Sequence, residues 1–238
     1  MLLIKLDAID STNTFLKDLA AKEKVADFTT VTAESQTGGR GQMGAKWISE
    51  PGKNLTMSVL VNNRVPNYNQ LFALTAATAL AVKAALDPTV DLKIKWPNDI
   101  MAGDKKLGGI LIENIFLGDN IRSVIGIGVN VNQTQFDDLP NATSLAVIAQ
   151  AEFEITTLLE QIVENIKYRL SDLNNNAIQT LAEYNQHLFR RGETTLFRSQ
   201  AQTFSASIIG VGMDGLLQIE KVDGTTAKFN LKEVEMMY

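Results

Sequence analysis

The distribution of glycine constrains this chain more than any other feature of its sequence. Five of the 16 glycines lie within residues 38–52 and six lie within residues 103–128, whereas residues 53–102 and 129–191 contain none. Glycine allows sharp turns and lets a ligand approach the backbone closely, and binding groups commonly sit on connections held by rigid elements. The sequence therefore predicts a regular scaffold with two glycine-rich loops that form one ligand site. The alternative is that both clusters are only hairpin turns.

The segments around these loops have the periodicity of strands and helices. Alternating or branched apolar runs predict strands at residues 2–6, 28–34, 55–61, 92–96, 107–115 and 122–131. Apolar residues at helical spacing predict helices that begin after Asp10-Ser11, at residues 71–86 and at residues 157–170, where Thr157 and Glu160 resemble a capping box. Asp-Gly pairs at 214–215 and 223–224 predict β-hairpins. We therefore expect an α+β domain over residues 1–189 and a small all-β domain over residues 190–238.

The residue types exclude several kinds of site and partner. The chain has no cysteine and a single histidine, His187, which excludes thiol nucleophiles and multi-histidine metal sites; we expect His187 to be structural. A net charge of -5 offers no basic face for nucleic acid. The longest uncharged apolar run, residues 71–82, is shorter than the ~20 residues of a membrane span. Because Lys5 and Asp7 interrupt any signal-peptide core, we expect a cytoplasmic protein with no membrane or nucleic-acid partner.

The first glycine cluster contains a match to a dinucleotide-binding motif that its context contradicts. Residues 39–44 satisfy the pattern G-x-G-x-x-G. A Rossmann fingerprint requires a helix at the last glycine, whereas a Pro-Gly pair follows at 51–52. We therefore reject a nicotinamide or flavin site and expect a loop that closes over an anionic ligand, carrying Trp47 and the cations Arg40, Lys46 and Lys53. A solvated surface loop with Trp47 in the core is the alternative.

The second cluster carries the most specific signal in the sequence. It follows the turn Lys95-Trp96-Pro97-Asn98-Asp99, and on local signals alone Asp99 is a turn residue and the lysines are hairpin-tip charges. Taken in chain order, a larger set of segments resembles the biotin protein ligases: DSTN at 10–13, ESQ at 34–36, GRG at 39–41, KWPND at 95–99, KLGGILIE at 106–113 and GIGVNVN at 126–132. KWPND followed by KLGGIL at this spacing is highly specific.

The resemblance implies a fold and a reaction. The expected fold is α+β, with a mixed β-sheet and helices in a class II synthetase-like biotin/lipoate ligase domain and an SH3-like C-terminal β-barrel. The expected reaction forms biotinoyl-5′-AMP from biotin and ATP, and then passes biotin to a lysine of the biotin carboxyl carrier protein of a biotin-dependent carboxylase. Neither step needs cysteine or histidine, because adenylyl transfer depends mainly on positioning and charge neutralisation. Mg²⁺ would accompany ATP with ligands that the sequence does not identify, and a homodimer is left open.

The resemblance also implies roles for individual residues. Arg40 and Lys106 would meet the biotin carboxylate and the adenylate phosphate, and Asp99 would orient or deprotonate the incoming lysine, or hold Mg²⁺. Short neutral side chains suit an uncharged ureido ring, and Ser11 could also cap a helix. The predicted biotin-binding residues are Ser11, Thr12, Asn13, Gln36, Gly39, Arg40, Gly41, Gln42, Lys106, Gly109, Gly126 and Gly128. The predicted ATP-binding residues are Arg40, Trp47, Asn98, Lys106, Val129 and Asn130.

The chain departs from the common family loop, and other functions compete with ligation. Gln42 and Ala45 stand where arginines are usual, so we expect weaker retention of the adenylate unless Lys46 or Lys53 compensates. A lipoate or octanoate ligase of the same superfamily is disfavoured by the polar pocket residues. A non-catalytic biotin-binding module would not require Lys106. A biotin-sensing repressor needs a winged-helix domain, for which we expect no room in the ten residues before Ser11.

Overall fold

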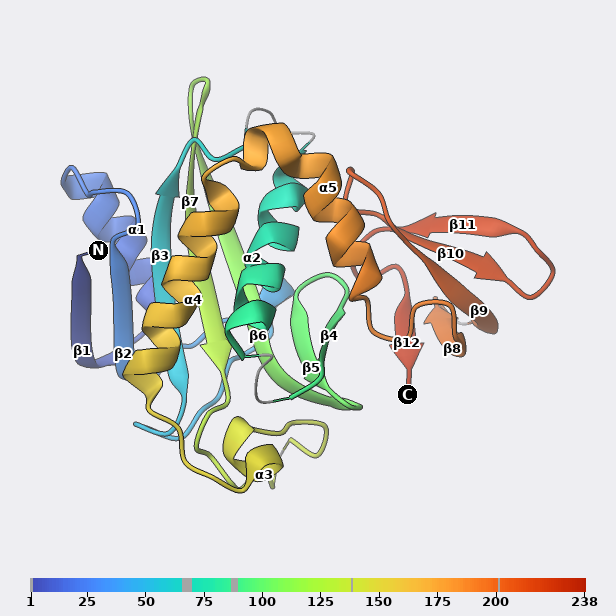
Figure 1. The fold of residues 1–238 in the computed structure, drawn as a ribbon, viewed down its shortest axis with the longest axis horizontal. Coiled ribbons are helices and arrows are strands. Elements are labelled where there is room, and N and C mark those ends of the chain that lie inside the picture. Colours follow the sequence, from blue (N-terminus) through green and yellow to red (C-terminus); the bar gives the residue numbers. More distant parts are fainter. Residues whose placement is uncertain (1, 66–69, 87–89, 138, 201) are drawn as a thin grey trace.

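The computed structural model describes residues 2–65, 70–86, 90–137, 139–200 and 202–238, and contains two β-sheets (Figure 1). The larger sheet has seven strands in the order β1-β2-β3-β7-β6-β5-β4; β1 and β2 are parallel and every other pair is antiparallel. Its strands are β1 (Leu3–Ile9), β2 (Thr30–Gln36), β3 (Leu55–Asn62), β4 (Leu92–Lys95), β5 (Asp99–Ala102), β6 (Lys105–Leu117) and β7 (Asn120–Val129). The smaller sheet is antiparallel and consists of β8 (Thr194–Ser199), β9 (Gln202–Val211), β10 (Leu217–Lys221), β11 (Thr226–Phe229) and β12 (Glu235–Met237).

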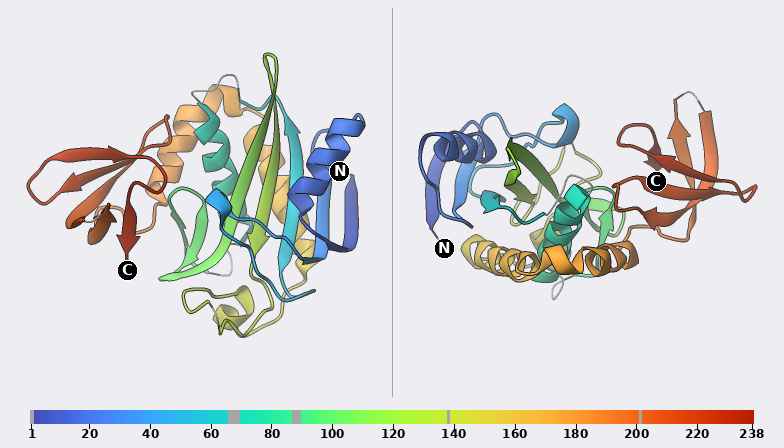
Figure 2. Two further views of the ribbon diagram at one scale, coloured as in Figure 1. Left: turned by 180° about the vertical axis from the view of Figure 1, so that it is seen from behind. Right: turned by 90° about the horizontal axis from the view of Figure 1, so that it is seen from above.

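Helices cover the two faces of the larger sheet unequally. The longer helices lie together on one face, while α1 packs on the other face against β2, β3 and β7 (Figures 1 and 2). The helices are α1 (Thr12–Lys22), α2 (Leu71–Leu86), α3 (Leu145–Ala149), α4 (Ile155–Leu170) and α5 (Leu173–Gln186), with a 3-10 turn at Gln42–Gly44. The glycine-rich segment after β2 runs across the α1 face of the sheet, which the longer helices do not cover (Figure 2).

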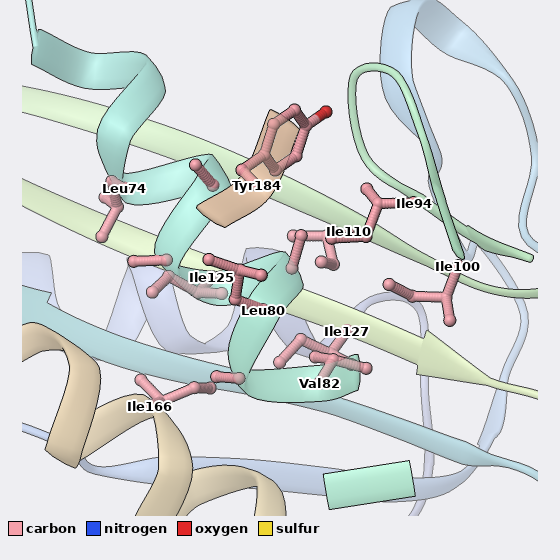
Figure 3. Close-up of a cluster of buried hydrophobic side chains, with 14 of the residues drawn as sticks. Leu74, Leu80, Val82, Ile94, Ile100, Ile110, Ile125, Ile127, Ile166 and Tyr184 are labelled. Carbon is pink, nitrogen blue, oxygen red and sulfur yellow. The ribbon is translucent and has the colours of Figure 1, made fainter. Parts of the chain in front are cut away.

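The core fills the space between α2 and the larger sheet. Leu74, Leu80 and Val82 of α2 face Ile110, Ile125 and Ile127 of the central strands, and these side chains are almost fully buried (Figure 3). Burial of such apolar surface is worth roughly 25 cal/mol per Å². The core therefore fixes β6 and β7, which carry most glycines of the second cluster.

Tyr184 connects α5 to the turn that precedes β5. Its side chain is fully buried, and its hydroxyl donates a hydrogen bond to the carbonyl of Pro97 over 2.9 Å. Burial, and to a smaller extent the negative charge of Asp99, raises the pKa of Tyr184 well above its usual value, so the hydroxyl keeps its proton. The hydrogen bond from the buried Tyr184 thus anchors the turn before Asp99 to the core.

The predicted fold class is confirmed, with differences in detail. The mixed sheet, the helix at residues 71–86 and the hairpins at both Asp-Gly pairs are present. The capping box is wrong: Glu154 caps α4 by accepting from the amide of Thr156, which places Thr157 inside the helix. Strand β5 was not predicted, because its four residues follow a proline turn directly and are too few to show a period.

The chain passes from the larger sheet to the smaller one within a few residues. The amide of Phe189 donates to the carbonyl of Ile94 in the larger domain, whereas the amide of Gly192 donates to the carbonyl of Ile208 in the smaller one. We therefore propose the division at 189/190 that the sequence suggests. Among the described residues, no helix has the length and apolar character needed to cross a membrane.

Candidate active site

A cavity of about 230 Å³ lies on the α1 face of the larger sheet. Its walls come from the start of α1, the end of β2, the loop at residues 40–47, the start of β5 and the strands β3, β6 and β7. The structure thus brings both glycine-rich segments to one site. Most predicted site residues line it: Ser11, Thr12, Asn13, Gln36, Arg40, Gly41, Gln42, Trp47, Asn98, Asp99, Lys106, Gly109, Gly126 and Gly128.

The first glycine-rich loop folds back on itself. The amide of Gly41 donates to the carbonyl of Ala45 over 2.7 Å, and the amide of Trp47 donates to the carbonyl of Gly39 over 3.0 Å. A Cβ on Gly39 would lie 2.5 Å from the Trp47 carbonyl oxygen, so the closed loop requires glycine there even though Gly39 does not line the cavity. After the 3-10 turn no helix forms before β3, which confirms the rejection of a dinucleotide fingerprint.

Lys106 and Asp99 form an ion pair at the cavity wall. The Lys106 Nζ lies 2.7 Å from the Asp99 Oδ1. The pairing of β5 with β6 shifts by one residue, because Ile100 faces Gly108 while Met101 faces Lys106. Such bulges commonly redirect a side chain near a site, and here the bulge turns Lys106 toward Asp99. A Cβ on Gly109 would lie 3.3 Å from the Lys106 Nζ, so glycine leaves room for the pair.

Neutral polar side chains form a connected network at the start of α1. The Gln36 Oε1 accepts from the Thr12 amide over 2.8 Å and from its hydroxyl over 3.1 Å. The Ser58 Oγ contacts the Thr12 Oγ1 at 2.8 Å and the Asn13 Oδ1 at 2.5 Å. Ser11, which is buried, accepts from the amide of Thr14 as the N-cap of α1. Ser11 therefore acts as a helix cap while also lining the cavity.

The guanidinium of Arg40 lies at the rim of the cavity beside a carboxylate. It donates to the Thr14 Oγ1 over 2.8 Å and lies 3.5 Å from the Glu113 Oε2. Burial raises the pKa of Glu113, but hydrogen bonds from Lys17 and Asn13 and the charges of Lys17 and Arg40 outweigh it, so this pKa lies below its usual value. Glu113 is therefore ionised at neutral pH.

Of the residues predicted to bind ATP, Trp47 and Asn98 line the cavity, whereas Val129 and Asn130 do not. The Trp47 ring covers Gly128, where a Cβ would lie 2.5 Å from the ring, and its indole Nε1 is buried with no hydrogen-bond partner among the described residues. Asn98 lines the cavity and donates from its Nδ2 to the Ile110 carbonyl. Val129 is 1% exposed and faces the core, and the Asn130 Nδ2 donates to the Thr143 carbonyl. Neither of these two lines the cavity, and their contact with ATP stays a prediction.

Sequence reasoning missed several residues at the site. Glu113 ends the segment KLGGILIE, and no role was predicted for it. Strand alternation nevertheless places it on the same face as Gly109 and Leu111. Ser58 lies on β3, and no signal in the sequence marks it. Neither Glu113 nor Ser58 lines the cavity itself; the cavity-lining residues outside the predicted catalytic, biotin and ATP sets are Ala45, Lys46, Thr56, Met57, Ile110, Leu111 and Ile127.

Comparison with known proteins identifies the family. Residues 6–132 match the model of the Biotin/lipoate A/B protein ligase family. The bifunctional ligase/repressor BirA of Bacillus spizizenii is 32% identical over 231 residues, which cover 93% of this chain and 70% of that protein. The biotin–(acetyl-CoA-carboxylase) ligase of Mycobacterium tuberculosis is 30% identical over 73% of this chain and 66% of that protein. A biotin protein ligase from Aquifex aeolicus, solved in complex with biotin and ATP, has a TM-score of 0.82 and 26% identity, with 99% of this chain and 98% of that one covered. This chain belongs to the biotin/lipoate A/B protein ligase family.

Proposed function

We propose that this chain is a biotin protein ligase, which activates biotin with ATP to biotinoyl-5′-AMP and transfers the biotinoyl group to a protein lysine. One observation carries the proposal: a single cavity combines a network of neutral polar side chains at one end with the cations Arg40 and Lys106 at its rim and wall. Neutral donors and acceptors suit an uncharged ureido ring, whereas a charged group would lose solvation there. The names of the relatives and the biotin and ATP complex support the same activity.

The first step joins two anions, and the cations of the site reduce their repulsion. A carboxylate oxygen of biotin attacks the α-phosphorus of ATP, and the bond from that phosphorus to the pyrophosphate breaks. Lys106 and Arg40 neutralise the charge that builds on the reacting carboxylate and phosphate. Gly109, which has no side chain, lets the Lys106 ammonium lie directly against β6.

The second step transfers the biotinoyl group to an amine. The lysine nitrogen attacks the biotinoyl carbonyl, AMP leaves, and the amine loses a proton. Asp99 is the carboxylate that lines the cavity among the described residues, so it is the proposed acceptor or orienting group. Its ion pair with Lys106 keeps it next to the reacting atoms.

Mg²⁺ fits this site as an ion carried by the nucleotide. Within the described part of the chain, no group of three metal-ligating side chains occurs, and Mg²⁺ commonly binds through substrate phosphates and one or two carboxylates. Asp99 would supply the carboxylate in its alternative role, in which it holds Mg²⁺ instead of accepting the lysine proton, and the metal would neutralise phosphate charge.

The remaining parts of the proposal concern partners and location. We propose the biotin carboxyl carrier protein of a biotin-dependent carboxylase as the acceptor, and the cytoplasm, where ATP is plentiful, as the location. The acidic composition supports the absence of a nucleic-acid partner. Sedimentation of the apo and adenylate-bound protein would decide whether the chain forms the homodimer that the sequence leaves open.

The decisive experiment is ATP–pyrophosphate exchange with biotin or lipoate as the acid. We expect exchange that depends on biotin. Exchange with lipoate and not biotin would instead identify a lipoate ligase. Biotin binding without any exchange would identify a non-catalytic binding module.

A further inference from the structure

Glu113 joins three elements at the edge of the cavity. It lies on β6, two residues beyond the cavity-lining Leu111, and its carboxylate contacts α1 and the glycine-rich loop. The Oε2 accepts from the Asn13 Nδ2 over 2.9 Å and lies 3.5 Å from Arg40, while the Oε1 accepts from the Lys17 Nζ over 2.6 Å. These segments are separated by up to 100 residues in sequence. Neither step of the proposed reaction uses this carboxylate.

We propose that Glu113 is a positioning residue: its carboxylate fixes the orientation of the Asn13 amide and restrains the Arg40 guanidinium at the cavity rim. This inference rests on the proposed function, because Asn13 and Arg40 are the residues through which Glu113 would affect biotin.

The argument for Asn13 follows from donor and acceptor chemistry. An ionised carboxylate only accepts hydrogen bonds, so the NH₂ end of the amide must face Glu113. The Oδ1 then faces Ser58 and Gly126, where a Cβ would lie 2.4 Å from it. Because a carbonyl oxygen has two lone pairs and Ser58 uses one, the second can accept from a ureido N–H. Asn13 is 4% exposed, so its amide depends on protein partners such as Glu113 rather than on solvent.

The argument for Arg40 follows from exposure and distance. The Arg40 side chain is 46% exposed, and its contact with Glu113 is longer than a hydrogen bond. Lys17 shares the charge of the carboxylate at 2.6 Å, which weakens its hold on Arg40 further. Such a contact restrains the guanidinium without trapping it, because exposed ion pairs are weak. An anionic ligand can therefore draw Arg40 inward from a position that is already close to the cavity.

The test compares biotin binding in three variants by calorimetry without ATP. Glu113→Ala should raise the Kd for biotin about tenfold or more, while Glu113→Gln should have a smaller effect, because it keeps an acceptor oxygen and loses the charge. Glu183→Gln is the matched control, since Glu183 is also an ion-paired carboxylate with a lowered pKa but lies on α5. It should bind biotin as the unaltered protein does. Thermal melting of each variant checks folding.

A double-mutant cycle separates positioning from a general structural effect. In an Asn13→Ala background, Glu113→Ala should change the Kd for biotin less than threefold. Additive effects in the cycle, or unchanged biotin affinity in both Glu113 variants, would overturn the inference while leaving the proposed function intact. Failure of the unaltered protein to bind biotin would overturn both. Should Glu113→Ala unfold, Glu113→Gln decides the result through the same cycle.

Discussion

At the scale of single residues, both predicted cations have partners within the protein. Lys106 pairs with Asp99, and Arg40 contacts Thr14 and Glu113. Their side chains are 39% and 46% exposed. Exposed ion pairs contribute about 0–1 kcal/mol to stability. The fold therefore does not depend on these two side chains, and their function can be tested by removal.

We predict that Lys106→Ala and Arg40→Ala each slow adenylate formation by about 10²- to 10³-fold, because each removes one preorganised charge from the reacting phosphate and carboxylate. Melting temperatures should change little. Single-turnover formation of biotinoyl-AMP measures the rate. A near-normal rate in either variant would remove that residue from the catalytic set.

Two glycines of β7 lie beside residues that we assign to different substrates, so substituting each glycine should affect a different substrate. A Cβ on Gly126 would lie 2.4 Å from the Asn13 Oδ1, whereas a Cβ on Gly128 would lie 2.5 Å from the Trp47 ring. We predict that Gly126→Ala weakens biotin binding more than tenfold. Gly128→Ala should mainly raise the KM for ATP in pyrophosphate exchange. If both substitutions weakened biotin binding equally and left the KM for ATP unchanged, the assignment of Trp47 to the nucleotide would be contradicted.

The sequence could specify many of these residues, and strand alternation explains where it did not. Gly126 and Gly128 lie on the cavity face of β7, so the side chain of the next residue, Val129, faces the core. The assignment of Val129 to ATP follows the motif alone and stays a prediction. Glu113 continues the alternation of Gly109 and Leu111, so its place on the cavity face of β6 could be predicted from the sequence. Its contact with Asn13 could not, because that requires the packing of α1 on the sheet.

At the scale of elements, the loop between β2 and β3 combines a closed base with an exposed tip. Its base is held by the Gly39–Trp47 and Gly41–Ala45 hydrogen bonds, while Met43 at the tip is 58% exposed. We predict fast amide exchange at residues 40–46 without ligand and protection when biotinoyl-AMP binds, because ligand contacts offset the entropy of ordering. Hydrogen exchange measured by mass spectrometry tests this. Equal exchange rates in both states would show that the loop is preformed.

Helices α4 and α5 are linked by a bidentate ion pair that gives a pH-dependent stability. Arg169 donates to both Glu183 oxygens over 2.8 and 2.9 Å. The hydrogen bond from Arg169, opposed by burial, lowers the pKa of Glu183 below its usual value. A lowered folded-state pKa stabilises the fold above the unfolded value, and this stabilisation is lost as pH falls through the folded value.

We therefore predict that Glu183→Gln lowers the free energy of unfolding by about 0.2–1 kcal/mol at pH 7. The difference from the unaltered protein should shrink as the pH falls through the lowered pKa of Glu183. Urea unfolding at several pH values measures it. A difference that grows toward acid pH would mean that the Arg169 pair does not stabilise the ionised form of Glu183.

Element boundaries were predictable where periodicity was long. The helix at residues 71–86 has sixteen residues with a continuous apolar character, and its predicted bounds match α2. Strand β5 has four residues and becomes a strand only because β4 and β6 pair with both of its edges. The ion pair of Asp99 and Lys106 therefore depends on the pairing of β5 with β6, which the local sequence does not encode.

At the scale of the whole molecule, the small domain contacts the site as well as the core. The Trp96 Nε1 donates to the Gly215 carbonyl over 3.0 Å, next to the turn that leads to Asp99. The Lys232 Nζ donates to the Met43 carbonyl over 3.1 Å at the tip of the glycine-rich loop. The small domain therefore touches the first glycine-rich loop and the turn before β5, although neither contact was visible from the sequence. Lys232 thereby brings a cation to Met43, which follows Gln42 in the chain, and Gln42 stands where an arginine is usual in the family.

We predict that Lys232→Met speeds the release of preformed biotinoyl-AMP by less than tenfold and raises amide exchange at residues 40–46. A hydrogen bond from a charged group contributes about 1.5–3 kcal/mol when shielded, and solvent at this exposed contact reduces that value. Lys228→Met is the matched control, because Lys228 lies in the same domain and faces Asp214 at 3.9 Å. Affinity differences between related complexes arise mostly in dissociation, so release of labelled adenylate is the measurement. Equal release from both variants and the unaltered protein would mean that the loop retains the adenylate without the small domain.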